Sequence, residues 1–377
     1  MTADLPRPTA ATASPVRIVG SGLLGASLGL ALRAAGVDVQ LADTSPVSLA
    51  LARDLGAGTI PDPAADVPEP ALVVVSTPPD VAASVVRTEL AAHPGAVVTD
   101  IASVKAVIAA EVLEGASPDD AARYVGSHPM AGRERSGASG ADADLFAGRP
   151  WVVVPTESSS PAAVAAARSL ASDVGSFVVQ MGAAEHDRAV AVVSHLPQVL
   201  SSVLASRLND ADETALDLAG QGLRDTTRIA AADSRLWTAI LTGNAAALRD
   251  ELVAVRESLD HVLGAIEQGL ADPLAQGAIG PLDRVIRSGN EGAARIPGKH
   301  GGAPGRYTEV TVLVPDNPGA LGRLFGEVGE AGVNIEDLGI EHSAGQRVGL
   351  VRLSVVPQAA AGLEAELDRR GWRVVAR

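Results

Sequence analysis

The chain has 377 residues, and at about 150 residues per domain this length predicts two or three domains. Its 45 acidic residues outnumber its 30 basic ones and give a formal net charge of −15, which argues against nucleic acid as a partner. The absence of cysteine excludes disulfides, cysteine-bound metal centres and thiol nucleophiles.

The first fifteen residues are polar and rich in proline, and we expect a disordered segment over 1–15. They have neither the basic start nor the apolar core of a secretory signal. No apolar run in the sequence approaches the roughly 18 residues needed to span a bilayer. We therefore expect a soluble, cytoplasmic protein that does not bind a membrane.

Residues 16–181 alternate short runs of β-branched residues with alanine-rich stretches of helical length. This alternation predicts βαβ units, and therefore a parallel sheet that helices bury on both faces. It is the pattern of an α/β, Rossmann-like dinucleotide-binding domain. The expected strands are 16–20, 37–43, 71–79, 96–100, 124–129, 151–155 and 176–181.

The pattern changes after residue 181. Residues 182–286 contain only helical patterns and predict an all-helical second domain. Residues 287–305 are rich in glycine, arginine and proline, without periodicity, and predict a linker. Residues 306–377 have the strand and helix order βαββαβ, which predicts a ferredoxin-like domain.

The first expected strand ends in GSGLLGASL, which places Gly20, Gly22 and Gly25 in the GxGxxG spacing. The motif follows a strand and opens a helix, which is the context of a dinucleotide-binding turn. In such a turn Gly20 allows the tight bend, Gly22 lets the backbone approach a pyrophosphate, and Gly25 lets helix and strand pack closely. A glycine-rich turn without a ligand is the alternative.

Asp43 ends the second expected strand, where a carboxylate accepts hydrogen bonds from ribose hydroxyls and repels a 2′-phosphate. The expected cofactor is therefore NAD rather than NADP, although Arg33 and Arg53 keep the second possibility open. An ordinary aspartate that starts a turn is the other interpretation. The rest of the expected cofactor site consists of Leu23, Leu24, Ser76 and Thr77.

Further polar residues follow later strands, at the sheet edge where open α/β folds bind ligands. Ser103 comes just after the run 96–100, and His128 lies at the end of the run 124–129, with Glu134 in the loop that follows. A histidine is suited to act as a general base near pH 7, and a purely structural histidine is the alternative.

The helical region contains a polar stripe at helical spacing, formed by His195, Gln198, Ser202 and Ser206. A histidine that only satisfies a contact between helices fits the same stripe. We also expect the helical region to form a homodimer, because its helices are rich in alanine and leucine on more than one face.

Two arginines, Arg224 and Arg228, lie four residues apart and are expected on one face of a helix. Two guanidinium groups on one face can hold carboxylates in bidentate pairs. A solvated pair bridged to Asp225 and Asp233 is the alternative that spacing alone favours.

Five motifs in this order resemble the prephenate dehydrogenase family, including its arogenate-using relatives, over nearly all of residues 16–377. They are GSGLLGASL, TDIASVK, GSHPMAGRERSG, VVSHLP and GLRDTTRIAAADSRLW. The resemblance implies an active site at Ser103, His128, His195 and Arg228, a cofactor site at Gly20, Gly22, Gly25 and Asp43, and positions near the substrate at Glu134, Arg224 and Trp237. Gln198 departs from members that have histidine there, which bears on the choice between a keto acid and an amino acid.

The resemblance implies NAD-dependent oxidative decarboxylation of prephenate to 4-hydroxyphenylpyruvate, without a metal. In this reaction His128 accepts the hydroxyl proton, Ser103 orients the reactants, and Arg228 holds a carboxylate. Conversion of arogenate to tyrosine is the first alternative. A β-hydroxyacid dehydrogenase, a pyrroline carboxylate reductase and a non-catalytic amino-acid sensor are the others, and the first of these usually has a catalytic lysine where this chain has His195.

The sequence from Tyr307 to Leu338 resembles an ACT domain, a regulatory module that commonly binds amino acids. A helix start there offers free backbone donors to a carboxylate. We therefore expect an allosteric site for tyrosine at Asn317, Gly319, Asn334 and Ile335. A module that only dimerises or tethers is the alternative.

Overall fold

The protein is represented by a computed structural model, which describes residues 10–62, 64–132, 137–271, 276–296, 307–342 and 348–375. The chain divides into two compact units. The first comprises Met1–Ala211 and Thr226–Ala254, and the second comprises Asp212–Asp225 and Val255–Arg377. This division cuts through the expected helical domain 182–286, so the boundaries of that domain stay a prediction.

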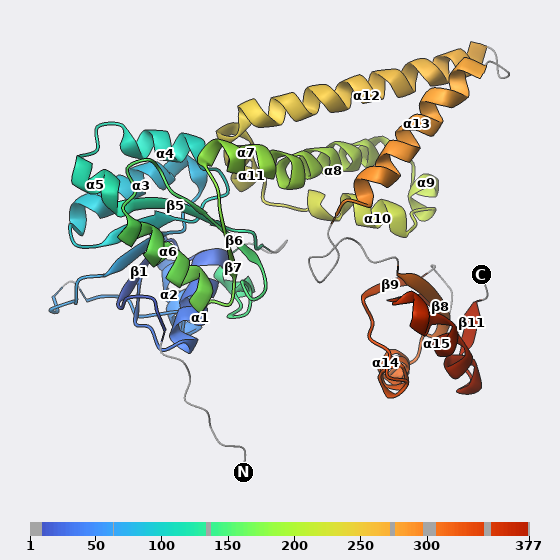
Figure 1. Cartoon of the computed structure of the whole chain (residues 1–377), viewed down its shortest axis with the longest axis horizontal. Helices are drawn as coiled ribbons and strands as arrows, with labels where there is room; N and C mark the ends of the chain where they lie inside the picture. The colour runs from blue at the N-terminus through green and yellow to red at the C-terminus, as the bar shows by residue number, and fades with distance from the viewer. Residues whose placement is uncertain are drawn as a thin grey trace. The chain divides into compact units, whose positions relative to one another are not determined.

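The first unit contains a seven-stranded sheet with the strand order β2-β1-β3-β4-β5-β6-β7 (Figure 1). All seven expected runs form strands. Their bounds are β1 Val16–Val19, β2 Val39–Ala42, β3 Leu72–Val75, β4 Val97–Asp100, β5 Tyr124–Pro129, β6 Pro150–Val154 and β7 Phe177–Gln180. β1 lies in the middle of the early strands and pairs in parallel with both β2 and β3.

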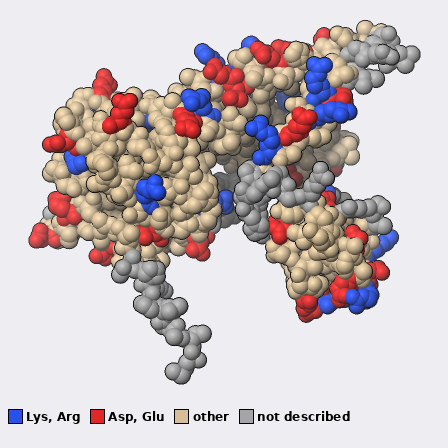
Figure 2. Space-filling view, in the orientation of Figure 1, with Lys and Arg blue, Asp and Glu red and all other residues tan. Residues whose placement is uncertain are grey.

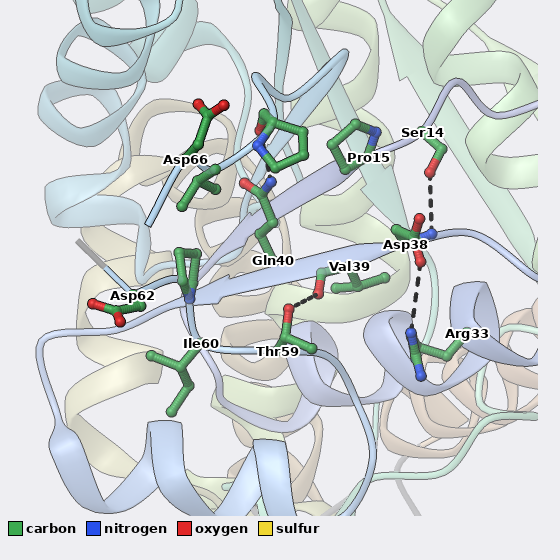
Figure 3. A pocket seen from close by; sticks show the side chains of 13 residues that line it. Ser14, Pro15, Arg33, Asp38, Val39, Gln40, Thr59, Ile60, Asp62 and Asp66 are labelled. Atoms are coloured by element: carbon green, nitrogen blue, oxygen red, sulfur yellow. Dashed lines mark hydrogen bonds and ion pairs between the residues drawn. The ribbon is translucent and has the colours of Figure 1, made fainter. Parts of the chain in front are cut away.

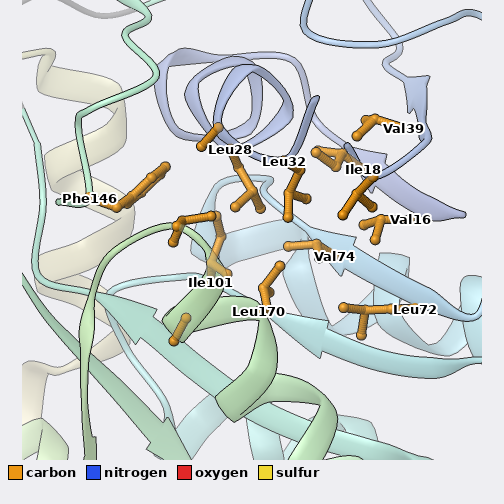
Figure 4. Close-up of a cluster of buried hydrophobic side chains, with 14 of the residues drawn as sticks. Val16, Ile18, Leu28, Leu32, Val39, Leu72, Val74, Ile101, Phe146 and Leu170 are labelled. Atoms are coloured by element: carbon orange, nitrogen blue, oxygen red, sulfur yellow. The ribbon is translucent and has the colours of Figure 1, made fainter. Parts of the chain in front are cut away.

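Helices bury both faces of this sheet, as the β-branched runs predict. One face packs against α1, α2 and α6 through residues such as Ile18 and Val74 (Figure 4). The other face packs against α3, α4 and α11 through residues such as Val75 and Val98. The bounds are α1 Leu23–Ala34, α2 Pro46–Asp54, α3 Pro79–Ala92, α4 Ala106–Leu113, α5 Pro118–Arg123, α6 Pro161–Asp173 and α11 Ser234–Gly243.

Three of these helices begin with the same local signal, a serine followed by proline. Ser45, Ser117 and Ser160 each accept a hydrogen bond from a backbone N–H in the first turn of α2, α5 and α6. The following proline has a φ that suits the first helical position and lacks the N–H that would otherwise be unpaired there. These starts are therefore fixed locally by the sequence.

The expectation of a wholly parallel sheet is wrong at one pair of strands. β5 and β6 are antiparallel, with Gly126 opposite Val154 and Pro129 opposite Trp151. A parallel return needs a crossover connection that spans the length of the sheet. In the described part of the connection the longest regular element is the short 3₁₀ helix η1 Ala138–Gly140, so the chain turns back beside β5 instead.

A helical segment follows the sheet. It consists of α7 Ala183–Val190, a π-helical turn η2 Ala191–His195, α8 Leu196–Ser206 and a 3₁₀ turn η3 Arg207–Asp210. The apolar side of this segment faces outward, with Val193 on η2 65 % and Val203 on α8 56 % exposed. The polar side, with His195 and Gln198, is buried. This reverses the usual arrangement for a surface helix.

By length and composition alone, the run Ala183–Asp210 is apolar enough to cross a membrane, with a mean hydropathy of 1.5 over its best window. The sequence analysis finds no such run, because it counts uninterrupted apolar residues. A core helix of a soluble protein passes the same test. The buried side of this run carries His186, Asp187 and His195, which take part in hydrogen bonds within the first unit.

The rest of the helical region lies in both units. The 3₁₀ turn η4 Arg228–Ala230 and α11 belong to the first unit, and α12 Ala245–Ala271 begins there. α9 Glu213–Asp217, α10 Gln221–Thr227 and α13 Gln276–Ala293 belong to the second. The expected linker 287–305 is therefore wrong over residues 287–293, which are helical. The glycines in 287–293 do not end α13. An ion pair between Asp283 and Arg287, with an N–O distance of 2.7 Å, supports this helix.

The second unit also contains a four-stranded antiparallel sheet in the order β11-β8-β10-β9. Its elements have the expected βαββαβ order. They are β8 Thr308–Pro315, α14 Ala320–Glu330, β9 Asp337–His342, β10 Val348–Val355, α15 Pro357–Arg369 and β11 Arg373–Val375. The two helices cover one face of the sheet through a core that includes Val312, Leu324 and Leu367.

Charged side chains are distributed over the surface of the first unit. On the face that Figure 2 shows, acidic side chains are scattered among neutral ones and do not gather into one patch.

Candidate active site

The glycine-rich turn joins β1 to α1 and presses against the end of β3. Gly20 has φ +104°, and a Cβ there would lie 2.5 Å from the carbonyl oxygen of Ser76. A Cβ on Gly25 would lie 1.9 Å from the carbonyl oxygen of Gly20. Only glycine fits these two positions. At Gly22, by contrast, a Cβ would meet no atom within 4 Å, so this part of the turn is open to a ligand.

Asp43 lies just beyond β2, and its carboxylate holds the turn. Its Oδ2 accepts a hydrogen bond from the backbone N–H of Ser21 at 2.6 Å, and its Oδ1 accepts one from the N–H of Ser45 at 2.7 Å. Each carboxylate oxygen has a second lone pair that remains able to accept a ribose hydroxyl. The two arginines that leave NADP open are already paired, Arg33 with Asp38 at 3.8 Å and Arg53 with Asp54 at 2.7 Å.

Two buried hydroxyls at this turn have no hydrogen-bond partner among the described residues. They are Ser21 Oγ in the glycine-rich turn and Thr77 Oγ1 just beyond β3. Next to them α1 begins at Leu23 and Leu24, after a glycine that has no side chain with which to cap the helix. A helix N-terminus and unpaired hydroxyls beside an open glycine suit a pyrophosphate and its ribose. The turn therefore fits a dinucleotide.

A buried ion pair underlies the loop that follows β4. Lys105 is 1 % exposed and contacts Asp100, which also accepts hydrogen bonds from Tyr124 Oη at 2.8 Å and from the N–H of Ala102 at 3.1 Å. Burial lowers the pKa of Lys105, and the attraction of Asp100 opposes this shift. Removing one partner of such a pair is costly, so the pair fixes the loop that carries Ser103.

His128 lies near the carboxyl end of β5 and is 8 % exposed. Its Nδ1 is 2.9 Å from Nε2 of His186, whose Nδ1 is 2.8 Å from Oδ1 of Asp187. Asp187 also accepts backbone hydrogen bonds from Lys105 at 2.9 Å and Ala106 at 2.8 Å, which ties α7 to the start of α4. A chain His128–His186–Asp187 thus connects the sheet to the helical segment.

The direction of this chain follows from its acceptor end. Burial raises the pKa of Asp187, but hydrogen bonds from His186 and two backbone amides outweigh burial and hold it below its usual value. The carboxylate therefore accepts a hydrogen bond from the Nδ1–H of His186. With the His186 proton on Nδ1, its other nitrogen, Nε2, is an acceptor, so His128 donates from Nδ1 and keeps a lone pair on Nε2.

The protonation state of His128 suits a base. Burial, together with the neighbouring His186, Lys105 and His195, holds the pKa of His128 well below its ordinary value of 6.5. The imidazole is therefore neutral near pH 7. Its Nε2 makes no hydrogen bond within the described part of the chain, so it is available to take a proton from a bound hydroxyl.

A second buried histidine, His195, ends the π-helical turn η2. Its Nδ1 is 3.1 Å from Nδ2 of Asn244, and its ring meets the Trp237 ring edge-on at a centroid distance of 6.2 Å. Burial lowers the pKa of His195 to about 4, so it too is neutral near pH 7. π-Helical turns of this kind frequently occur at functional sites.

The remaining expected substrate-site residues lie on several different elements. Gln198 is buried on α8, one turn beyond His195, and its Nε2 donates to Ser202 at 3.3 Å. Arg228 opens η4, a turn that packs against α8. Arg224 lies on α10, which ends at Thr227, and Arg228 follows in η4, so their expected placement on one helical face stays a prediction. Glu134 lies outside the described residues.

Three residues of this network are not predicted from the sequence, namely His186, Asp187 and Asn244. All three are buried and hydrogen-bonded to one of the two histidines or to their partners. The adjacent histidine and aspartate at the start of a helix are a signal that could have pointed to two of them.

The expected effector residues lie in the second unit. Gly319 has φ +86° and precedes α14, and Asn317 lies two residues before it in the turn after β8. Asn334 donates from Nδ2 to Oε1 of Glu336 at 2.8 Å, and Ile335 packs against the core of this unit.

A separate pocket of about 470 Å³ lies at the amino ends of β1 and β2 (Figure 3). Its lining includes Ser14, Arg33, Gln40 and Thr59. The glycine-rich turn and His128 lie at the carboxyl ends of their strands, so this pocket is at the opposite edge of the sheet. It is therefore not the dinucleotide site.

The turn, the acidic end of β2 and the neutral buried histidine define the class of protein, which is a nicotinamide-dependent dehydrogenase with NAD as its cofactor. Two family models match the chain. The nucleotide-binding domain of prephenate dehydrogenase matches residues 28–180, and the dimerization domain of prephenate dehydrogenase matches residues 182–278. The chain belongs to the prephenate dehydrogenase family.

Individual relatives agree with this assignment. The chain is 37 % identical to a probable prephenate dehydrogenase, NovF, of Streptomyces niveus, over 94 % of this chain and 98 % of the relative. It is 27 % identical to prephenate dehydrogenase of Bacillus subtilis, over 90 % and 91 % of the two chains.

Two solved structures share the fold. One is prephenate dehydrogenase of Aquifex aeolicus in complex with hydroxyphenyl propionate and NAD⁺, with a TM-score of 0.63, 26 % identity and coverage of 74 % of this chain and 98 % of that one. The other is Synechocystis arogenate dehydrogenase, with a TM-score of 0.58, 28 % identity and the same coverage.

Proposed function

We propose that the chain catalyses the oxidative decarboxylation of prephenate to 4-hydroxyphenylpyruvate with NAD. Family membership supports the reaction class, and the observation that carries the mechanism is the chain His128–His186–Asp187, which leaves Nε2 of His128 as a free acceptor. NAD supplies the acceptor for the hydride of the hydroxyl-bearing ring carbon.

One side chain, His128, serves as the base that takes up and returns the hydroxyl proton. Loss of hydride converts the ring alcohol to a carbonyl, and His128 Nε2 takes the hydroxyl proton. The ring carboxylate then leaves as carbon dioxide, and its electron pair aromatises the ring to a phenolate. His128 returns the proton to the phenolate oxygen. Prephenate and NAD⁺ thus give 4-hydroxyphenylpyruvate, carbon dioxide and NADH, with no net proton released.

Other side chains bind and orient the substrate. Ser103, on the loop after β4, orients the ring hydroxyl and the nicotinamide amide. His195 presents a neutral ring to the substrate, and Arg228, on a turn that packs against α8, pairs with a carboxylate. Arg224, Glu134 and Gln198 complete the proposed substrate site, and Gly20, Gly22, Gly25, Asp43, Ser76 and Thr77 complete the proposed cofactor site.

Turnover by the purified protein tests this function. Prephenate with NAD is expected to increase absorbance at the NADH band, with a lower kcat/KM when NADP replaces NAD. No increase with either substrate or either cofactor would refute the activity. An NADP preference would refute the role given to Asp43.

Arogenate is the second candidate substrate, and Gln198 is the observation that favours it. A neutral amide replaces the histidine of some relatives one turn from His195, and an amide can accept from an ammonium group as well as donate. Arogenate dehydrogenase of Synechocystis is also among the similar structures. Parallel assays decide between the substrates, and a kcat/KM for arogenate far above that for prephenate would make the protein an arogenate dehydrogenase.

The exposed apolar side of η2 and α8 supports a homodimer, for which a cytoplasmic location is part of the proposal. Val193 on η2 and Val203 and Leu204 on α8 are exposed, so a single chain leaves them in water. A second copy that covers this face removes apolar surface from water, and the matched family model is described as a dimerization domain. Sedimentation equilibrium at micromolar concentration is expected to give a dimer, and a stable monomer would refute it.

The βαββαβ unit is proposed to be an ACT domain that binds tyrosine, the end product, and inhibits the enzyme. Gly319, Asn317, Asn334 and Ile335 are the proposed contacts. Reciprocity requires that the substrate weaken tyrosine binding by the factor by which tyrosine weakens substrate binding. Rates with and without tyrosine, for the full chain and for a chain that ends near residue 302, test this. Equal inhibition of both would place tyrosine at the active site, and inhibition of neither would exclude it as the effector.

A further inference from the structure

Asn244 lies between α11 and α12, and its side chain joins the two parts of the histidine network. It is 5 % exposed. Its Nδ2 donates to the backbone oxygen of Asp187 at 2.7 Å and lies 3.1 Å from Nδ1 of His195. Its own N–H donates to Ile240, and its carbonyl accepts from Leu248, so both helices fix its backbone.

The orientation of this amide follows from the chemistry of its partners. A backbone carbonyl only accepts hydrogen bonds, so the atom of Asn244 that faces Asp187 must be the NH₂ nitrogen. The second hydrogen of the same nitrogen is then directed at Nδ1 of His195. That ring nitrogen must accept, and in a neutral imidazole the proton must therefore sit on Nε2.

Asp187 consequently anchors both histidines in opposite tautomers. Its carboxylate acts through His186 and leaves His128 with a lone pair on Nε2, whereas its backbone oxygen acts through Asn244 and leaves His195 with an N–H on Nε2. Neither free Nε2 has a partner in the described part of the chain. The two rings thus offer one acceptor and one donor.

We propose that Asn244 is a positioning residue that holds His195 as an Nε2–H donor for the substrate, and this proposal rests on the proposed function. Prephenate and arogenate both present carboxylate and hydroxyl oxygens, which accept hydrogen bonds. With the opposite tautomer His195 would face them with a lone pair. Asn244 therefore contributes to substrate affinity without contacting the substrate.

The variant Asn244→Asp tests this assignment with nearly the same shape. A carboxylate cannot donate, so His195 must donate to it from Nδ1, and the proton leaves Nε2. The added negative charge also raises the pKa of His195. Below that raised pKa both ring nitrogens carry protons and the donor is restored, and above it the donor is lost.

The KM of the variant is expected to rise with pH relative to the KM of the unaltered enzyme. The ratio of the KM of Asn244→Asp to that of the unaltered enzyme should rise about tenfold or more from pH 6 to pH 9, with kcat changed by no more than about threefold. Other titratable groups near His195 are His186 and Asp187 on α7 and His128 on β5, and Arg228 lies on η4, which packs against α8, the helix that follows His195. Because all four are present in both enzymes, the ratio isolates the effect of residue 244.

Asn290→Asp is the matched control. It makes the same change from amide to carboxylate at an exposed position on α13 in the second unit. It should leave KM unchanged at every pH. A rise in KM for Asn244→Asp that is independent of pH, or no rise, would overturn the proposal. Unchanged NAD affinity confirms that the variant is folded.

The tautomer itself gives a second test that needs neither turnover nor a variant. In the ¹⁵N-histidine NMR spectrum of the unaltered protein at pH 7, the His195 signals should show a protonated Nε2 and an unprotonated Nδ1. Assignment uses the loss of those signals in His195→Gln. A proton on Nδ1 would overturn the proposal even in an active enzyme. If neither substrate is turned over, the proposed function fails, while this spectrum still reports on Asn244.

Discussion

The glycine-rich turn and the histidine network lie in the same compact unit but satisfy their polar atoms in different ways. In the turn, the buried hydroxyls of Ser21 and Thr77 have no partner among the described residues. In the network, Asp187 accepts from His186 and from two backbone amides, and Asn244 donates to two acceptors. The turn is therefore completed by a ligand, whereas the network is organised before any ligand arrives.

This difference predicts that damage to the two regions can be separated. Changes in the turn should act on NAD affinity, because the ligand supplies the missing hydrogen bonds. Changes in the network should act on the chemical step or on substrate binding and leave the affinity for NAD unchanged. A network variant that weakens NAD binding as much as it slows turnover would contradict this separation.

The largest effect is expected from His128→Asn, which removes the proposed base. We expect kcat to fall by about 10²–10⁴-fold while the Kd for NAD stays within about twofold. Steady-state kinetics and NAD titration measure the two quantities. His261→Asn, at an exposed position on α12, is the matched control. A near-normal kcat would show that another group is the base, and a weakened NAD complex would contradict the separation.

Asp187→Asn should reduce kcat by about 10²-fold, because an amide can hold His186 in the wrong tautomer and no longer stabilises positive charge on the ring. Its effect on NAD should again be small. The comparison with Asp187→Glu sharpens the test, since a restored carboxylate should recover part of the rate. If Asp187→Asn weakens NAD binding by as large a factor as it slows turnover, the network is not independent of the turn.

The turn itself allows a paired experiment on two glycines. Gly22→Ala should leave the melting temperature unchanged, because its Cβ meets no atom within 4 Å, but should raise the Kd for NAD by about tenfold or more. Gly25→Ala should lower the melting temperature as well, because its Cβ would lie 1.9 Å from a carbonyl oxygen. Calorimetry and NAD titration distinguish the two. Equal loss of stability in both variants would contradict the open geometry at Gly22.

The difference between the two regions also explains what could be predicted from sequence. The turn is local, since Gly20, Gly22 and Gly25 lie within six consecutive residues and Asp43 acts from the next strand, so spacing alone identifies it. The network depends on pairs that are far apart in sequence, such as His128 with His186 over 58 residues and Asp187 with Asn244 over 57. Single-sequence patterns identify each residue type but not these contacts.

The fold shows the same limit. β-Branched runs predict all seven strands of the large sheet, because strand propensity and burial are local properties. The direction of β6 depends on how its connection crosses the sheet, and the run 151–155 contains no information about direction. Likewise, the composition of residues 287–293 favours a linker, although the helix that begins earlier continues through them.

The smallest expected effect is a loss of stability on mild acidification. Burial keeps the folded-state pKa of His128 well below 6.5 and that of His195 at about 4, whereas both return to about 6.5 on unfolding. The unfolded chain therefore binds more protons than the folded chain below about pH 6.5, so the free energy of unfolding falls as the pH falls toward 4. Asp187, whose folded pKa is lowered, contributes stability above its unfolded pKa that is lost only at still lower pH.

Thermal unfolding between pH 7.5 and pH 5 measures this effect, and we expect Tm to fall by about 3–6 °C. The double variant His128→Asn with His195→Gln removes both titrating rings and should flatten the curve over this range, whereas His261→Asn should not. NAD should raise Tm at every pH without changing the slope, because neither His128 nor His195 belongs to the turn that NAD completes. A slope that NAD abolishes would mean that the turn and the histidine network respond as one region.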